Sequence, residues 1–129
     1  MSAGKYNFIV EQGSQHDVSF RYKTSDGNGL DLTGYRVRMA VKDHITDTTF
    51  VYRASTSSSS DANHLQHFTI GSNQNQAAEA GKFSLSIPAT TTTAFSFNQG
   101  VYDLELVAPA GTVTRILEGK FKIKLQVSE

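Results

Sequence analysis

The feature that most constrains this chain is a strict alternation of apolar and polar residues in several short segments. It is clearest in residues 6–10, 18–22 and 35–41, and in the last of these Val37 and Met39 alternate with arginines. A β-strand sends successive side chains to opposite faces, so such a segment offers one face to a core and one to water. The pattern therefore predicts half-buried strands, whereas helical periodicity is hard to find anywhere in the chain.

Further segments complete the predicted set of strands: residues 48–53, 65–70, 83–87, 101–107 and 112–127. Pro88 ends the strand 83–87, and the residues after it are rich in threonine, a β-branched residue with weak helix propensity. We therefore expect only one short helical turn, near residues 89–95. About seven or eight short antiparallel strands with turns between them predict an all-β sandwich.

A tyrosine in the segment 101–107 makes the fold prediction more specific. Tyr102 stands two residues before the apolar Leu104, at the start of a late strand. Immunoglobulin-type sandwiches place a tyrosine there, with its hydroxyl bonded back to the preceding loop. We therefore predict an immunoglobulin-like β-sandwich with Leu104 in its core. Tyr102 is predicted to be buried, with its hydroxyl bonded to a backbone group within or next to residues 93–97.

The last hairpin predicts an irregularity in its return strand. A loop of residues 109–111 places Leu104 opposite Ile116, which makes Ile116 an inward residue. Phe121, however, lies at the opposite parity from Ile116. One extra residue must reset the alternation, and Gly119 is the predicted β-bulge because glycine tolerates the distorted backbone there.

Two segments of a single domain over residues 1–129 are predicted to be mobile loops, residues 54–63 and 71–81. The first contains a run of serines and no large apolar residue, so it cannot bury enough surface to become ordered by itself. Such a segment is free to become ordered against a partner. The predicted partner-contact residues are Thr56, Ser57, Ser58, Ser59 and Ser60.

Charge and composition exclude several classes of protein. The 129 residues contain 12 Lys and Arg and 12 Asp and Glu, so bulk charge does not predict a nucleic-acid or membrane surface. The absence of cysteine excludes a disulfide framework and a thiolate metal site. No apolar run approaches the ~20 residues that span a bilayer, and residues 1–5 lack the core of a signal peptide.

The candidate chemical groups do not form a convincing reaction centre. His64 and His67, near Asp61, are too few for a zinc site, and their spacing puts them on opposite faces of a strand. His16 and Asp17 are adjacent on a predicted strand and point apart, and the chain has no nucleophile elbow. We therefore expect no catalytic residues, no cofactor and no metal.

Several segments together resemble a known family. They cover about two-thirds of the chain, and residues 46–80 contribute nothing to the likeness. This arrangement resembles a family of small structural proteins of tailed bacteriophages and, more distantly, the N-terminal domain of phage baseplate upper proteins. The segments are Tyr6-Asn7-Phe8, Glu11-Gln12-Gly13, Asp26-Gly27, Leu30-Asp31-Leu32-Thr33-Gly34-Tyr35, Arg38-Met39, Ile87-Pro88-Ala89-Thr90, Tyr102-Asp103-Leu104-Glu105-Leu106, Gly111-Thr112-Val113-Thr114-Arg115 and Leu117-Glu118-Gly119.

The resemblance implies a non-enzymatic virion protein of the tail or baseplate that acts as an assembly adaptor or a fibre anchor. Its implied partners are other phage structural proteins, with this chain as a homo-oligomer or in several copies, assembled in the host cytoplasm. Two alternatives stay open: a capsid decoration protein and a carbohydrate-binding module for the host surface. Tyr35, Tyr52, Phe95 and Phe97 are candidates for a sugar platform, although such aromatic residues more often belong to a core.

Overall fold

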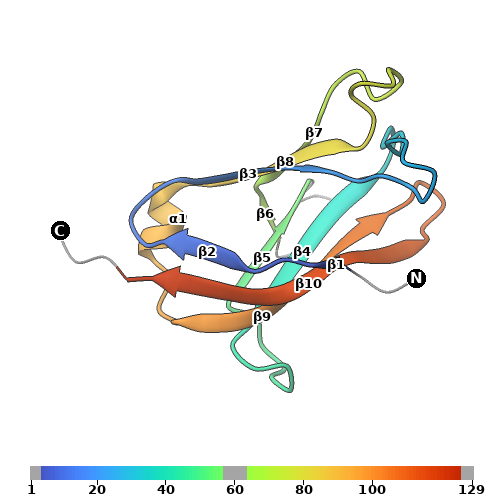
Figure 1. Cartoon of the computed structure of the whole chain (residues 1–129). Helices are drawn as coiled ribbons and strands as arrows, with labels where there is room; N and C mark the ends of the chain where they lie inside the picture. Colours follow the sequence, from blue (N-terminus) through green and yellow to red (C-terminus); the bar gives the residue numbers. More distant parts are fainter. Residues whose placement is uncertain (1–3, 57–63, 126–129) are drawn as a thin grey trace.

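The computed structural model of the chain describes residues 4–56 and 64–125, which form two β-sheets that face each other (Figure 1). The larger sheet contains β1 (Gly4–Lys5), β2 (Phe8–Glu11), β4 (Arg36–Lys42), β5 (Tyr52–Ser55), β6 (Leu65–Gln66), β9 (Gln99–Val107) and β10 (Val113–Lys124). The smaller sheet contains β3 (His16–Arg21), β7 (Phe68–Ile70) and β8 (Lys82–Ile87). One short helix, α1 (Ala89–Thr93), follows β8. Among the described residues, no helix is long and apolar enough to cross a membrane.

The strand order defines the fold. The larger sheet runs β1-β10-β9-β4-β5-β6, with β2 also on β10, and the smaller one runs β3-β8-β7. The pairs β10–β9, β9–β4, β4–β5, β3–β8 and β7–β8 are antiparallel, whereas β1 and β2 lie parallel to β10 and β6 lies parallel to β5. This is an immunoglobulin-like β-sandwich, as predicted. The predicted strand 65–70 is split into β6 and β7, and β1 is an additional strand that precedes the predicted segment 6–10. The predicted strand 48–53 begins only at Tyr52, as β5.

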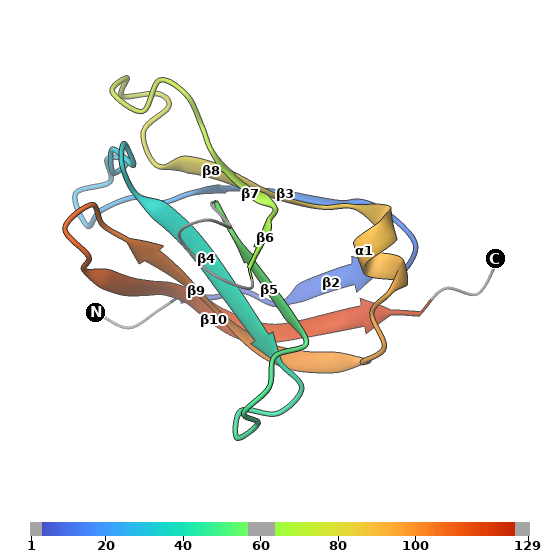
Figure 2. The same ribbon diagram turned by 180° about the vertical axis from the view of Figure 1, so that it is seen from behind.

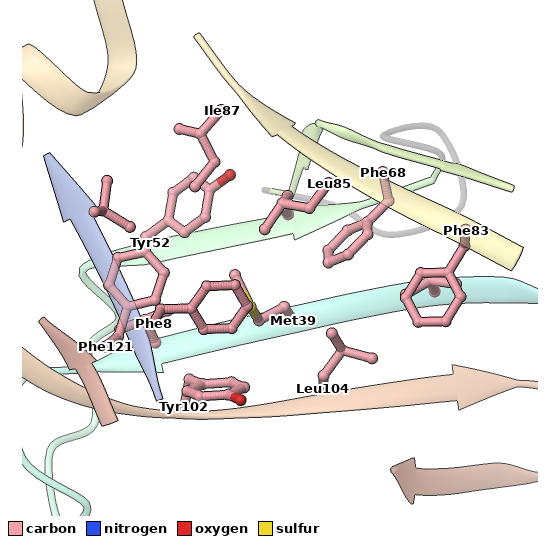
Figure 3. Packing of buried hydrophobic residues seen from close by; sticks show 14 of the residues in the cluster. Phe8, Met39, Tyr52, Phe68, Phe83, Leu85, Ile87, Tyr102, Leu104 and Phe121 are labelled. Carbon is pink, nitrogen blue, oxygen red and sulfur yellow. The ribbon is translucent and has the colours of Figure 1, made fainter. Parts of the chain in front are cut away.

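The core fills the space between the two sheets (Figure 3). Strand β4 illustrates how alternating side chains build this core: Val37, Met39 and Val41 are buried, and the residues between them are half-exposed. Aromatic rings dominate the end of the core near β2, where the ring of Phe8 lies 4.9 Å from that of Tyr102 in an edge-to-face contact. Such contacts add specific geometry to the burial of apolar area, which is the main force holding the sheets together.

Tyr102 and Leu104 are buried as predicted, with 5% and 0% of their surface exposed. The predicted hydrogen bond of the tyrosine is wrong, however. The Tyr102 hydroxyl donates to the backbone carbonyl of Tyr6, not to a group in residues 93–97. The reason lies in the pairing of the N-terminal segment with β10, because this pairing lays the Tyr6 carbonyl beside the next strand, β9.

The predicted bulge lies at a different residue. The register of β9 and β10 shifts between Arg115 and Leu117, so Leu104 pairs with Leu117 and Ile116 is the extra residue. Gly119 is needed for a different reason. A Cβ atom at this position would lie 2.4 Å from the Tyr6 carbonyl oxygen, so only glycine lets the N-terminal segment approach β10 so closely.

The helical turn forms where it was predicted. Pro88 follows β8 in an extended conformation and precedes the helix α1. The fully buried Thr92 fixes this turn to the N-terminal half of the chain. Its hydroxyl donates to the Ser14 carbonyl at 2.8 Å and accepts from the Gly13 N–H at 3.1 Å.

The prediction of a mobile loop over residues 54–63 is wrong at its start. Ala54 and Ser55 belong to β5 and are fully buried, and the Thr56 N–H donates to the Val37 carbonyl at 3.0 Å. These residues are ordered by strand pairing, which a composition argument cannot detect. The remaining part, residues 57–63, lies outside the described residues.

The second predicted loop contains no strand, but one buried side chain anchors it. Gln74 is only 5% exposed, and its amide oxygen accepts from the backbone N–H groups of Leu32 and Gly81. Its amide nitrogen donates to the carbonyls of Gly71 and Lys82. The prediction of a mobile segment over residues 71–81 overlooked this set of four hydrogen bonds.

We expect Tyr102→Phe to lower the free energy of unfolding by about 0.5–1.5 kcal/mol, because it removes one hydrogen bond and keeps the packing. Leu104→Ala should cost about 2–5 kcal/mol, because it leaves a cavity in the core. A urea titration of both variants measures the order of the two losses. Equal and negligible losses would contradict the burial of these side chains.

Gln74→Ala should lower the free energy of unfolding by about 2–4 kcal/mol, because it leaves buried backbone groups without partners. Gln76→Ala is the matched control, since Gln76 is exposed in the same loop and its loss should stay within about 0.5 kcal/mol. Equal effects of the two substitutions in thermal or urea unfolding would show that the loop is not anchored through Gln74.

Candidate interaction surface

The outer face of the larger sheet carries a network of ion pairs that link neighbouring strands. Strand β4 pairs with β9 so that Arg38 lies opposite Glu105, and the Arg38 Nε lies 2.8 Å from the Glu105 Oε1. Farther along β9, Asp103 forms an ion pair with Arg115, whose Nη2 lies 3.3 Å from the Asp103 Oδ2. At the edge of the sheet, the ammonium group of Lys5 pairs with the carboxylate of Glu118. The polar residues of the alternating strands therefore form a charged surface on which ion pairs connect neighbouring strands.

A hollow opens in the middle of this face, with a volume of about 610 Å³. Its floor includes Ala40 of β4 and Val101 and Asp103 of β9, where short side chains leave room. Phe50 and Ile45 line it from the loop between β4 and β5, residues 43–51. The hollow therefore combines an apolar rim with charged walls.

The loop of residues 43–51, here called the β4–β5 loop, presents apolar side chains to solvent. Ile45 is 78% exposed, Phe50 40% and Val51 37%. Two cations hold the Phe50 ring: the Lys42 Nζ lies 5.1 Å and the Arg53 Cζ 4.5 Å from its centroid. The loop projects away from the sandwich in both views of the chain (Figures 1 and 2). Exposed apolar groups beside a charged hollow are a feature of protein-contacting surfaces.

The electrostatics of this face suit recognition. Burial, with a smaller contribution from the neighbouring Glu105, raises the pKa of the Asp103 carboxyl above its usual value. Arg115 and Arg38 oppose that shift. Each carboxylate on this face has a cationic partner, which is the arrangement expected of a fixed and charge-balanced docking surface.

The aromatic residues considered for a sugar platform lie mostly in the core, as the favoured interpretation predicted. Tyr52, Phe95 and Phe97 are 5–8% exposed and pack against one another or against Phe121. The Tyr52 hydroxyl forms a hydrogen bond of 2.6 Å with the His67 Nδ1. These three rings therefore offer no open face for a sugar.

One group of metal-ligand side chains escaped the sequence analysis. Asp43, His44 and Asp47 gather in the β4–β5 loop, with the His44 Nδ1 3.9 Å and 3.8 Å from the two carboxylates. A local turn explains this arrangement. The His44 N–H donates to the Asp47 side chain, and the Asp47 N–H donates to the His44 carbonyl. All three side chains are substantially exposed to solvent.

The predicted partner-contact residues do not join this surface as far as the structure describes them. Thr56 is half-buried, and its backbone is bonded to β4. Ser57, Ser58, Ser59 and Ser60 lie outside the described residues. The sequence signal that could have identified the β4–β5 loop is its Ile45, Phe50 and Val51, which interrupt a polar segment without following a period of two.

Comparisons with known proteins give no sequence relative and only a weak structural likeness. No family model matches the chain, and no curated protein matches it in sequence. Among solved structures, the chain is similar to murine CRIg, with 14% identity and a TM-score of 0.42 over 93% of this chain and 92% of that one. It is also similar to CopC from Methylosinus trichosporium OB3b, with 13% identity and a TM-score of 0.45 over 99% and 90%. The fold assignment rests on the strand order and register of the chain itself.

Two half-buried imidazoles, those of His16 and His67, make the stability of the fold sensitive to pH. Burial lowers the pKa of His16 below its usual value, although Asp17 and Glu11 partly oppose the shift, and burial also lowers the pKa of His67. The His16 Nε2 is buried and makes no hydrogen bond within the described part of the chain. The folded state therefore binds protons at these rings less readily than the unfolded state does.

We expect the free energy of unfolding to fall as the pH drops from about 7 to about 5, across the usual imidazole pKa and toward the lowered values. Stability from this source is fully present above the usual pKa and is lost below it. His16→Phe should flatten part of the slope, because it removes one of the two titrating rings. Urea titrations at several pH values measure this, and a slope that is the same in both proteins would exclude His16 as a source.

Proposed function

We propose that this chain is a non-enzymatic structural protein of a tailed-phage virion, present in several copies in the tail or baseplate. It acts there as an assembly adaptor or fibre anchor and assembles in the host cytoplasm. The resemblance of its sequence segments to small phage structural proteins supports the virion setting. The observation that carries the docking role is the outer face of the larger sheet, where the exposed Ile45 and Phe50 line a charged hollow.

The chemistry of this face matches a protein partner. The partner would place an apolar side chain against Ile45 and Phe50 and would add charges that complement the network at Asp103 and Arg115. A small number of apolar anchors provide most of the affinity of such an interface, and the surrounding charges set its register. A net charge of zero gives no strong long-range steering, so contact geometry has to provide the specificity.

Ile45→Asp should lower incorporation of the chain into particles about tenfold or more, because it removes an apolar anchor of the proposed interface. Val113→Asp is the matched control, since Val113 is 45% exposed and lies at the opposite end of the same sheet. Particles assembled in cells that supply each variant are purified, and the chain is quantified in them. Equal incorporation of the two variants would contradict docking through the β4–β5 loop.

The position of the chain in an intact particle separates the alternatives. Density for the chain at the tail or baseplate supports the proposal, whereas density across the capsid surface assigns a decoration role. Binding of the purified chain to a glycan array, without any place in the particle, would replace the proposal by the carbohydrate-binding alternative.

A further inference from the structure

Strand β3 is the longest strand in the described structure that has a partner on only one side. It spans six residues, and the smaller sheet ends there because only β8 pairs with it. The other edge strands are shorter, with four residues in β2, three in β7 and two each in β1 and β6. A long edge of this kind can add another strand through its main-chain groups.

The hydrogen-bond pattern identifies which backbone groups of β3 are open. The Ser86 N–H donates to the His67 carbonyl and the Lys82 carbonyl accepts from Gly71, so even-numbered residues of β8 bond toward β7. Odd-numbered residues of β8 therefore bond toward β3, where Leu85 is paired with Val18. The even-numbered residues of β3 therefore bond toward β8. The N–H and C=O groups of the odd-numbered residues point away from β8, toward the open edge of the sheet. These odd-numbered residues are Asp17, Ser19 and Arg21.

Three devices that often protect an edge strand, namely proline, a bulge and lysine, are missing from β3, although it carries the exposed charges of Asp17 and Arg21. It contains no proline, and its pairing with β8 continues without a bulge over its whole length. No lysine lies within it, and its inward side carries half-buried Val18 and Phe20. Natural sheets use proline, bulges and lysine to prevent pairing between edges, so their absence leaves β3 open to it.

We infer that β3 pairs antiparallel with β3 of a second copy of this chain, around a two-fold axis at Ser19. In this register all three outward residues are paired: Ser19 lies opposite Ser19 of the second copy, and Asp17 of each copy lies opposite Arg21 of the other. It therefore places opposite charges against each other twice. Asp17 and Arg21 are exposed on the outer face of the sheet. Within the chain, the Asp17 carboxylate accepts from the Ser86 hydroxyl, and the Arg21 guanidinium donates to the Ala77 and Ala80 carbonyls. A carboxylate and a guanidinium each have further hydrogen-bonding positions, so both can also contact the opposite charge across the junction.

Other registers with the same set of backbone groups are shorter and lose this charge match. A shift by two residues would place Asp17 or Arg21 opposite Ser19 and would leave one outward residue unpaired. The pairing around Ser19 also brings Val18 beside Phe20 of the other copy on the inward side, which extends the apolar core across the junction. The product is one continuous sheet in an isologous dimer.

Charge substitutions at the two-fold axis test this inference. Ser19→Lys and Ser19→Glu each place like charges opposite each other and should raise the dimer dissociation constant about fivefold or more. An equimolar mixture of these two variants should restore the dimer, because lysine then faces glutamate. Thr69→Lys is the matched control, since Thr69 lies in the same cross-strand row and on the same face, but on the far edge of the sheet.

Analytical ultracentrifugation over a range of concentrations measures the mass, which is 14.1 kDa for one chain and twice that for the dimer. Circular dichroism confirms that each variant folds. The inference fails if the natural chain stays monomeric up to about 1 mM, if Thr69→Lys weakens the dimer as much as Ser19→Lys, or if the mixture does not recover it. None of these outcomes depends on the proposed virion role, which is tested by incorporation into particles.

Discussion

The pairing of the N-terminal strands with β10, rather than with β3, is the constraint on which much of this structure depends. Strands β1 and β2 lie parallel to β10, and this brings the Tyr6 carbonyl over the end of the Tyr102 side chain. The same approach requires a glycine at position 119, because a Cβ atom there would overlap that carbonyl. It also leaves the outer side of β3 without a strand, so one choice of partner strand shapes both the core and an edge.

Strand β9 connects the packing of the core to the arrangement of charges on the outer face. It is paired on both sides, by β4 and β10, and its side chains alternate between the core and the outer face. Tyr102 and Leu104 are held inward, so Asp103 and Glu105 must face outward, beside the arginines of the neighbouring strands. The charged network is therefore a consequence of the register that buries the core, and a slip by one residue would destroy both.

The sequence predicted what depends on local periodicity and could not predict what depends on distant pairing. Alternation identified the strands around Met39 and Leu104, and Pro88 marked the end of β8. The partner of the Tyr102 hydroxyl was missed because Tyr6 is 96 residues away in the sequence. Gln74 looked like part of a polar loop, since only the folded chain brings four backbone groups around its amide. The β4–β5 loop lacked a period, so its exposed Ile45 became visible only in three dimensions.

The two proposed contact regions lie on different sheets, and this separation matters for the proposed assembly role. The β3 edge belongs to the smaller sheet, whereas the hollow beside Phe50 lies on the outer face of the larger one. A strand added at β3 leaves that outer face uncovered, so self-association and partner docking can occur together. The core between the sheets holds the two regions at a fixed relative orientation. A pair of copies would then present two identical docking faces related by the same two-fold axis, which is the geometry by which one small sandwich can bridge two equivalent partners.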